Sequence, residues 1–207
     1  MSFPIAVLLS GGGTTLLNLI DRVAAGTLPA RIVQVVSSRP DAFGVERARR
    51  AGLPVEVICR KSFATREAFS ERTFDVCRRA GAKMIVLGGF LQLLKIADDY
   101  RLKVLNIHPA LLPAFGGKGM YGHHVHEAVL EYGAKVSGCT VHFVDDQYDH
   151  GPIVAQRAVE VRDDDTPDTL AARVFAAECE LYPAVIRAVI EGRVSVSGRN
   201  VHITGPI

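Results

Sequence analysis

The sequence has little of what marks secreted or nucleic-acid-binding chains. Its four cysteines lie far apart and form no C-x-x-C pair: Cys59, Cys77, Cys139 and Cys179. This spacing favours reduced thiols in a cytoplasmic protein over a disulfide framework. The N-terminus lacks a basic region and a cleavage-site pattern, so we expect no signal peptide. The formal net charge of +2 is too small to predict nucleic-acid binding through a basic field.

Long hydrophobic runs are also missing. The longest lies near Met84 to Leu94, is interrupted by Gly88, Gly89 and Gln92, and is shorter than the roughly 20 residues of a membrane span. We therefore expect no membrane partner. Hydrophobic residues nevertheless make up 48% of the 207 residues, enough to fill a core. This length and the absence of repeats or low-complexity linkers predict one domain.

Short apolar runs alternate with helical patterns through the first half of the chain. Strands are expected at 3–9, 31–36, 55–58, 83–87 and 103–107, with helices at 16–23, 45–50 and 65–79. The third helix begins after Thr65, a possible N-cap, and ends before Gly81. Strands that alternate with helices in this way are typical of a parallel sheet covered on both faces.

The pattern changes after residue 134. Two longer strand-like runs at 136–144 and 153–161 predict an antiparallel edge hairpin, followed by a helix at 167–189 and a short hairpin from Gly192 onward. The predicted fold class is α/β: a Rossmann-like, mostly parallel twisted sheet flanked by helices, with the antiparallel hairpin in the C-terminal half.

A glycine-rich turn, Ser10-Gly-Gly-Gly-Thr-Thr15, joins the first strand to the first helix. Glycines allow close approach of an anion, and the N–H groups of a helix N-terminus favour phosphate. The turn is not a G-x-x-x-x-G-K-[ST] loop, and Leu16 occupies the place of the third glycine of G-x-G-x-x-G. Phosphate binding and simple chain reversal both fit this turn, and its position at a strand's carboxyl end favours phosphate.

Asn106 and His108 close the fifth predicted strand. Residues two apart on a strand point to one face, so both side chains reach the edge where open α/β sheets bind ligands. A neutral amide donor beside a histidine suits an oxyanion formed during acyl transfer. A strand end capped by satisfied polar groups is the structural alternative.

An acidic turn separates the two late strands and contains Asp145, Asp146 and Asp149 before Gly151-Pro152. Such residues are often only turn formers. One carboxylate here would instead orient a histidine and pass protons, and the residues themselves do not choose among the three.

Two further features carry alternatives. The paired glycines Gly88-Gly89 follow the fourth strand and suit either a ligand lying against the backbone or a tight turn. The histidines His123, His124 and His126 lack the H-E-x-x-H spacing and a nearby cysteine, so we expect surface or loop histidines and no metal site. His142 fits the core or a site equally well.

Several motifs together resemble the formyltetrahydrofolate-dependent transferase family. They are Asn106-Ile-His108-Pro109 with Leu111-Leu112-Pro113, Val141-His-Phe-Val144 and Asp149-x-Gly151-Pro152, and also Asp41-Ala-Phe-Gly44, Arg66-Glu-Ala-Phe69, Val86-Leu-Gly-Gly-Phe90 and Tyr182-Pro183. The likeness runs from Ile5 to about Pro183. Ordered motifs at family spacing are far more specific than any one alone.

The resemblance implies formyl transfer from 10-formyltetrahydrofolate, as co-substrate, to the amine of glycinamide ribonucleotide in purine synthesis. It implies small-molecule substrates, no metal, and a monomer or homodimer. The single domain of residues 1–207 would comprise a phosphate-binding half, 1–100, and a catalytic and folate-binding half, 101–190.

The resemblance also implies residue roles at the positions that match the family's motifs. The implied catalytic residues are Asn106, His108 and Asp149. The implied ribonucleotide contacts are Gly13, Thr14, Thr15 and Glu178, and the implied folate contacts are Arg66, Leu91, Gln92, Leu93, Leu94, Asp145 and Asp146.

The chain departs from the family pattern at a few positions. Thr14 and Thr15 replace the serine and asparagine common in the phosphate loop, and Thr15 lacks the amide. Gln92 stands where an arginine is frequent, and the loop from Gly116 to His126 is longer than in some members.

Other formyl transferases of the same fold are alternatives. We expect neither the methionyl-tRNA enzyme, which needs a further RNA-binding domain, nor a formyltetrahydrofolate hydrolase, which needs an N-terminal regulatory domain. A sugar-nucleotide formyl transferase is the nearest rival. A non-catalytic phosphate-binding module would use the glycine turn but would not need Asn106, His108 and Asp149 together.

Overall fold

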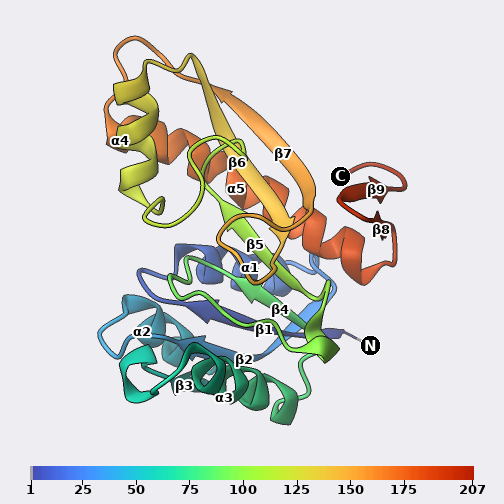
Figure 1. Cartoon of the computed structure of the whole chain (residues 1–207). Helices are drawn as coiled ribbons and strands as arrows, with labels where there is room; N and C mark the ends of the chain where they lie inside the picture. The colour runs from blue at the N-terminus through green and yellow to red at the C-terminus, as the bar shows by residue number, and fades with distance from the viewer. Residues whose placement is uncertain (1) are drawn as a thin grey trace. The chain divides into compact units, whose positions relative to one another are not determined.

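The computed structural model describes residues 2–207. The chain forms two compact units, Met1–Asn106 and Ile107–Ile207, and both are drawn in Figure 1. The boundary falls inside strand β5 (Val104–His108), so a single strand, and not a linker, joins the two units. Among the described residues, no helix is both long and apolar enough to cross a membrane.

The first unit is built on parallel strands. They are β1 (Phe3–Leu9), β2 (Ala30–Ser37), β3 (Val55–Val57), β4 (Met84–Leu87) and the first part of β5. β1 pairs with β2 and β4, β2 with β3, and β4 with β5, all in parallel. β1 and β4 read as continuous apolar runs because central strands of such a sheet are buried on both faces.

Helices cover this sheet. They are α1 (Thr14–Ala24), α2 (Phe43–Arg50) and α3 (Arg66–Arg79), with the short 3-10 helices η1 (Arg60–Ser62) and η2 (Asp98–Tyr100). α1 and α2 contact each other and β2, and α3 also contacts β2. The chain crosses from β3 back over β1 to reach β4, so right-handed crossovers place α3 on the face opposite α1 and α2.

The second unit combines an antiparallel ribbon with a long helix. Its elements are α4 (His123–Tyr132), β6 (Val136–Phe143), β7 (Ile153–Glu160), α5 (Pro167–Ile190), β8 (Val194–Ser197) and β9 (Asn200–Ile203). β6 and β7 pair antiparallel, and so do β8 and β9. α5 packs against both β6 and β7 and runs along them in Figure 1. Thr166 caps α5 by accepting a hydrogen bond from the Thr169 amide.

The predicted fold class is confirmed. The strand order is β3-β2-β1-β4-β5-β6-β7, parallel as far as β5 in the pairings described above, with β6-β7 as the antiparallel hairpin and β8-β9 as the late one. Thr65 is the N-cap of α3, as expected. α1 begins at Thr14, two residues before the predicted start, and the sequence pattern did not predict η1 or η2. That residues 1–207 form one domain stays a prediction.

Candidate active site

The glycine turn of the first unit has the geometry that only glycine allows at one position. Gly13 has φ 73° and is the N-cap of α1. A Cβ on Gly13 would lie 2.6 Å from the Cα of Gly44, whose amide donates to the Gly11 carbonyl at 3.0 Å. The turn is therefore packed against the start of α2, and Thr14 and Thr15 follow as the first helical residues. N–H groups at such a helix start suit a phosphate.

The segment after β4 lies beside this turn. The Ser10 amide donates to the Gly89 carbonyl at 3.0 Å, and the Ser10 hydroxyl accepts from the Leu91 amide at 2.9 Å. Across the strands, Leu8 pairs with Leu87 and Leu87 pairs with Asn106. The first unit therefore brings three predicted features to one edge of its sheet: the glycine turn, the segment that starts at Leu91, and Asn106.

The predicted folate contacts of the first unit differ in burial. Leu94 is buried, whereas Leu91, Gln92 and Leu93 are partly exposed. Arg66 is the first residue of α3, and its guanidinium Nε lies 3.6 Å from the Glu67 carboxylate. Arg66, Leu91, Gln92 and Leu93 therefore retain side-chain surface that a ligand can contact, whereas Leu94 does not.

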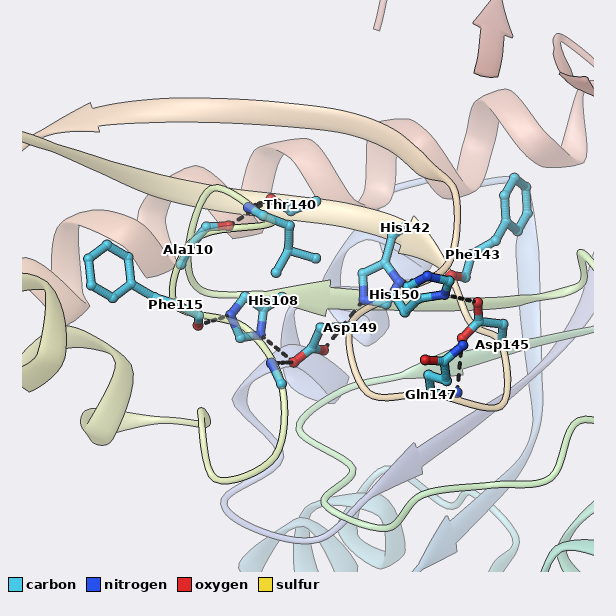
Figure 2. Close-up of polar contacts among 12 residues, drawn as sticks. His108, Ala110, Phe115, Thr140, His142, Phe143, Asp145, Gln147, Asp149 and His150 are labelled. Atoms are coloured by element: carbon cyan, nitrogen blue, oxygen red, sulfur yellow. Dashed lines mark hydrogen bonds and ion pairs between the residues drawn. The ribbon is translucent and has the colours of Figure 1, made fainter. Parts of the chain in front are cut away.

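In the second unit, the structure brings His108 and Asp149 together. Nδ1 of His108 lies 3.6 Å from Oδ2 of Asp149, and Nε2 of His142 lies 3.7 Å from Oδ1 of the same carboxylate (Figure 2). The Gly117 amide donates to Oδ2 at 2.9 Å. Asp149 is thus held by groups from β5, from the loop that follows β5 and from β6.

The hydrogen bonds define the His108 ring further. Nε2 of His108 lies 2.8 Å from the Phe115 carbonyl oxygen, which can only accept, so Nε2 carries hydrogen and donates. In the neutral ring, Nδ1, the nitrogen nearer Asp149, therefore carries no hydrogen and is the atom that can take up a proton. Burial lowers the pKa of His108 and outweighs the opposing effect of the Asp149 charge. The imidazole is therefore mostly neutral near pH 7.

The pKa of the Asp149 carboxyl lies below its usual value. Burial acts to raise it, but the hydrogen bond from His142, the charge of His108 and the Gly117 amide together outweigh burial. Asp149 is consequently ionised at neutral pH, and it is the only one of the three candidate aspartates placed against His108 by the distances given above.

Buried polar contacts fix the backbone between β5 and α4. The Thr140 hydroxyl donates to the Ala110 carbonyl at 2.6 Å and accepts from the Leu112 amide at 3.0 Å (Figure 2). The amide nitrogen of Gln156 donates to the Leu112 carbonyl at 2.9 Å and to Thr140 Oγ1 at 3.0 Å. β6 and β7 thereby hold the chain that leads to Phe115, the acceptor for His108.

Glu178 lies on the α5 helix of the second unit. Burial raises the pKa of its carboxyl to about 7. A carboxyl that titrates near neutral pH is common at functional sites, although burial alone also produces it. Asp145 and Asp146 are partly exposed in the turn after β6.

The histidine cluster is located on α4. His123 and His124 are exposed, as expected, but His126 is 4% exposed, and burial lowers its pKa to about 4. The expectation of a surface position is therefore wrong for His126, because it lies on the inward face of the helix with Val125 and Val129. Across residues 2–207, no three His, Cys, Asp or Glu side chains are grouped so as to hold a metal ion.

The sequence did not identify every participant. His142, left open between core and site, lies on the far side of Asp149 from His108. Its position two residues after the buried Thr140 on β6 was the available signal. The Phe115 carbonyl and the Gly117 amide carried no signal, because main-chain groups become specific only through the path of the loop.

Comparisons with known proteins agree on one family. The family described as formyl transferase matches residues 4–186. Phosphoribosylglycinamide formyltransferase of Escherichia coli K12 is 36% identical over 194 residues, 93% of this chain and 89% of that protein. The chloroplastic phosphoribosylglycinamide formyltransferase of Arabidopsis thaliana is 42% identical over 92% of this chain, which spans 66% of the plant protein.

A solved structure gives the same result. The crystal structure of glycinamide ribonucleotide transformylase 1 from Symbiobacterium toebii has a TM-score of 0.91 and 39% identity, and covers 98% of this chain and 94% of its own. The chain also aligns with trifunctional purine biosynthetic proteins, such as that of Gallus gallus, of which it spans 19%.

Proposed function

Because this chain belongs to the formyl transferase family, we propose that it transfers a formyl group from 10-formyltetrahydrofolate to the amine of glycinamide ribonucleotide, in the cytoplasm and as a step of purine synthesis. The observation that carries the proposal is the pairing of buried His108 with ionised Asp149 at the carboxyl end of β5. A phosphate-binding module has no use for that pair.

In the proposed reaction, the amine nitrogen attacks the formyl carbon carried on N10 of the folate. A bond forms between these atoms, and the carbonyl electrons move to oxygen to give a tetrahedral oxyanion. Asn106 and His108 donate hydrogen bonds to this oxyanion, and for this the Nε2–H of His108, which the Phe115 carbonyl accepts in the free protein, turns to the substrate. The carbon–N10 bond then breaks, and the proton lost by the amine reaches N10 through Asp149.

His108 is neutral before substrates bind, because burial lowers its pKa. A developing oxyanion favours the charged imidazole, as does the carboxylate 3.6 Å from Nδ1. The proton lost by the amine is therefore held at Nδ1 of His108 as negative charge appears on the substrate. Asp149 stabilises the resulting imidazolium and relays this same proton to N10 when the carbon–N10 bond breaks. Stabilisation that grows only in the transition state raises kcat.

The proposed contacts to the formyl acceptor, glycinamide ribonucleotide, are Gly13, Thr14, Thr15 and Glu178. The helix start of α1 suits the ribonucleotide phosphate, and Glu178 suits a polar group of the same substrate. Arg66, the segment from Leu91 to Leu94, Asp145 and Asp146 are the proposed folate contacts. Thr15 supplies a hydroxyl where the family often has an asparagine amide, and the threonine side chain reaches less far toward the phosphate.

The direct test is a transfer assay. Protein and 10-formyltetrahydrofolate are mixed with glycinamide ribonucleotide, a sugar-nucleotide amine or methionyl-tRNA, and folate absorbance is followed. We expect turnover only with glycinamide ribonucleotide, and no change when a chelator is added. Turnover with the sugar-nucleotide amine alone would contradict the proposed acceptor and identify the sugar-nucleotide amine as the substrate.

Substitution of the three proposed catalytic residues is the first prediction. We expect Asn106→Ala and His108→Ala to lower kcat by roughly 10²–10³-fold, the usual effect of losing one oxyanion donor, and Asp149→Asn to lower it comparably. The matched control is His124→Ala, which removes an exposed imidazole from α4. Undiminished kcat in folded His108→Ala protein would reject the assignment.

A further inference from the structure

The turn between β6 and β7 has to hold Asp149 in a backbone conformation that most residues avoid. Asp149 has φ 50°, in the left-handed region. Aspartate adopts this region more readily than most residues with a side chain, and contacts with its surroundings stabilise it there. The base of the turn is closed by the Phe143 amide, which donates to the Pro152 carbonyl at 2.9 Å.

A second link closes the turn next to Asp149. Nδ1 of His150 lies 2.6 Å from Oδ2 of Asp145, and Oδ1 of Asp145 accepts from the Gln147 amide at 3.0 Å (Figure 2). The residue that follows Asp149 is therefore tied to the beginning of the same turn. This contact is at the surface, since the His150 side chain is 47% exposed and that of Asp145 is 35% exposed.

The other side of His150 is held by the C-terminal hairpin. Nη2 of Arg199 donates to the His150 carbonyl oxygen at 2.7 Å, and Nη1 lies 3.4 Å from Nε2 of the same residue. Arg199 lies in the turn between β8 and β9, and β9 packs against β7. The hairpin thus places one guanidinium on both the main chain and the ring of His150.

The guanidinium also selects the form of the imidazole. Arginine only donates, so Nε2 of His150 accepts, and the ring hydrogen is on Nδ1, where it is donated to Asp145. Arg199, His150 and Asp145 therefore form a chain of directed hydrogen bonds. Each member has one role, and the chain begins at the hairpin and ends at the start of the turn.

We propose that Arg199 is a positioning residue for Asp149, acting through His150, an inference that rests on the proposed function for the meaning of its kinetic effect. Fixing the carbonyl and the ring of His150 fixes the residue that follows Asp149. This keeps the Asp149 carboxylate on the Gly117 amide and beside His108. Residue 199 lies beyond the part of the chain that matches the family, residues 4–186.

The test compares arginines of the same C-terminal region. Arg193 binds Glu191 and the carbonyls of Thr204 and Pro206, so Arg193→Ala loosens the C-terminal segment without losing any contact to the turn. We expect Arg199→Ala to lower kcat by about threefold, the factor that corresponds to the free energy of one exposed charged contact, while KM for the ribonucleotide stays the same. Arg193→Ala leaves kcat unchanged.

A structural readout separates this inference from the reaction. In Arg199→Ala, amide hydrogen exchange at Gln147 and Gly117 becomes faster, whereas in Arg193→Ala both rates equal those of the parent protein. Arg199→Lys keeps the charge but not the fork, and gives intermediate exchange and kcat. Because Arg199 acts through His150, Arg199→Ala lowers kcat by a smaller factor in a His150→Ala background than in the parent protein.

Two results overturn the inference. One is a folded Arg199→Ala protein whose kcat and exchange rates match those of Arg193→Ala. The other is faster exchange at Gln147 and Gly117 without any fall in kcat, which would make Arg199 structural only. If the parent protein transfers no formyl group, the proposed function fails, and unchanged exchange in Arg199→Ala still overturns the link separately.

Discussion

The carboxylate of Asp149 lies between two imidazoles, with His108 Nδ1 at 3.6 Å and His142 Nε2 at 3.7 Å. Their roles differ because only His108 lies on the strand that carries Asn106. His142 is 1% exposed, and its other ring nitrogen, Nδ1, lies 2.8 Å from the Phe143 carbonyl. The role that we propose for His142 is therefore to act on the ionisation of Asp149.

Removal of His142 tests this role. The hydrogen bond from His142 lowers the pKa of Asp149, so His142→Leu raises that pKa. We expect the acid limb of the kcat profile to move to higher pH, because Asp149 must be ionised to stabilise the His108 imidazolium. His124→Ala, on the surface of α4, serves as the control. A profile with an unshifted acid limb in folded His142→Leu protein contradicts the role.

Glu178 predicts a pH dependence of stability. Its pKa is raised to about 7 in the folded chain, against about 4.3 in an unfolded one. The folded state therefore binds the proton more tightly, and the associated stability is full below about pH 4 and is lost as the pH rises through 7. Glu178→Gln keeps the neutral shape at every pH.

We expect Glu178→Gln to raise the free energy of unfolding at pH 8 by roughly 1–3 kcal/mol and to leave it unchanged at pH 4. Urea titrations at the two pH values measure this. The same variant raises KM for the ribonucleotide, the proposed ligand of this carboxylate. Glu180→Gln removes a charge at an exposed position of α5 and is the control. Equal stabilisation by the two variants at pH 8 would contradict the assignment of the effect to the raised pKa of Glu178.

At the scale of elements, the turn from β1 to α1 depends on one glycine more than on its neighbours. Gly13 has φ 73°, and a Cβ there would meet the Gly44 Cα at 2.6 Å. A Cβ added to Gly12 would meet no neighbouring atom within 4 Å. Backbone cannot move aside as a side chain does, so the close approach of α2 decides which glycine is needed.

Alanine substitution distinguishes the two positions. We expect Gly13→Ala to lower the free energy of unfolding by more than about 1 kcal/mol, from the left-handed φ together with the clash, and to weaken phosphate binding. Gly12→Ala has a small effect on stability. Thermal unfolding, with and without the ribonucleotide, measures both. Equal shifts in Tm for the two variants would show that the turn relaxes freely.

At the scale of the whole molecule, the boundary between the two compact units falls after Asn106, inside β5. If one unit unfolded without the other, β5 would have to break in its middle and lose backbone hydrogen bonds there. We therefore expect one cooperative unfolding transition, with circular dichroism and tyrosine fluorescence coincident in urea. Two separated transitions would contradict the single-domain prediction.

Much of the fold was predictable because its signals are local. Apolar runs mark β1 and β4, Thr65 marks the start of α3, and the late pair of longer strands marks the change to antiparallel pairing. The sequence pattern does not mark the start of α1, because its N-cap is Gly13, which has a left-handed backbone and no side chain to form a cap. η1 and η2 are single turns without a periodic pattern.

The site divides in the same way. By itself, the sequence determined the type of chemistry, since the period of a strand puts Asn106 and His108 on one face, and the motif pattern indicated Asp149. Only the tertiary structure decided that His142 also contacts Asp149, that His126 is buried, and that Arg199 reaches His150. These features depend on how separate elements pack together, and no local sequence pattern encodes the distances between their side chains.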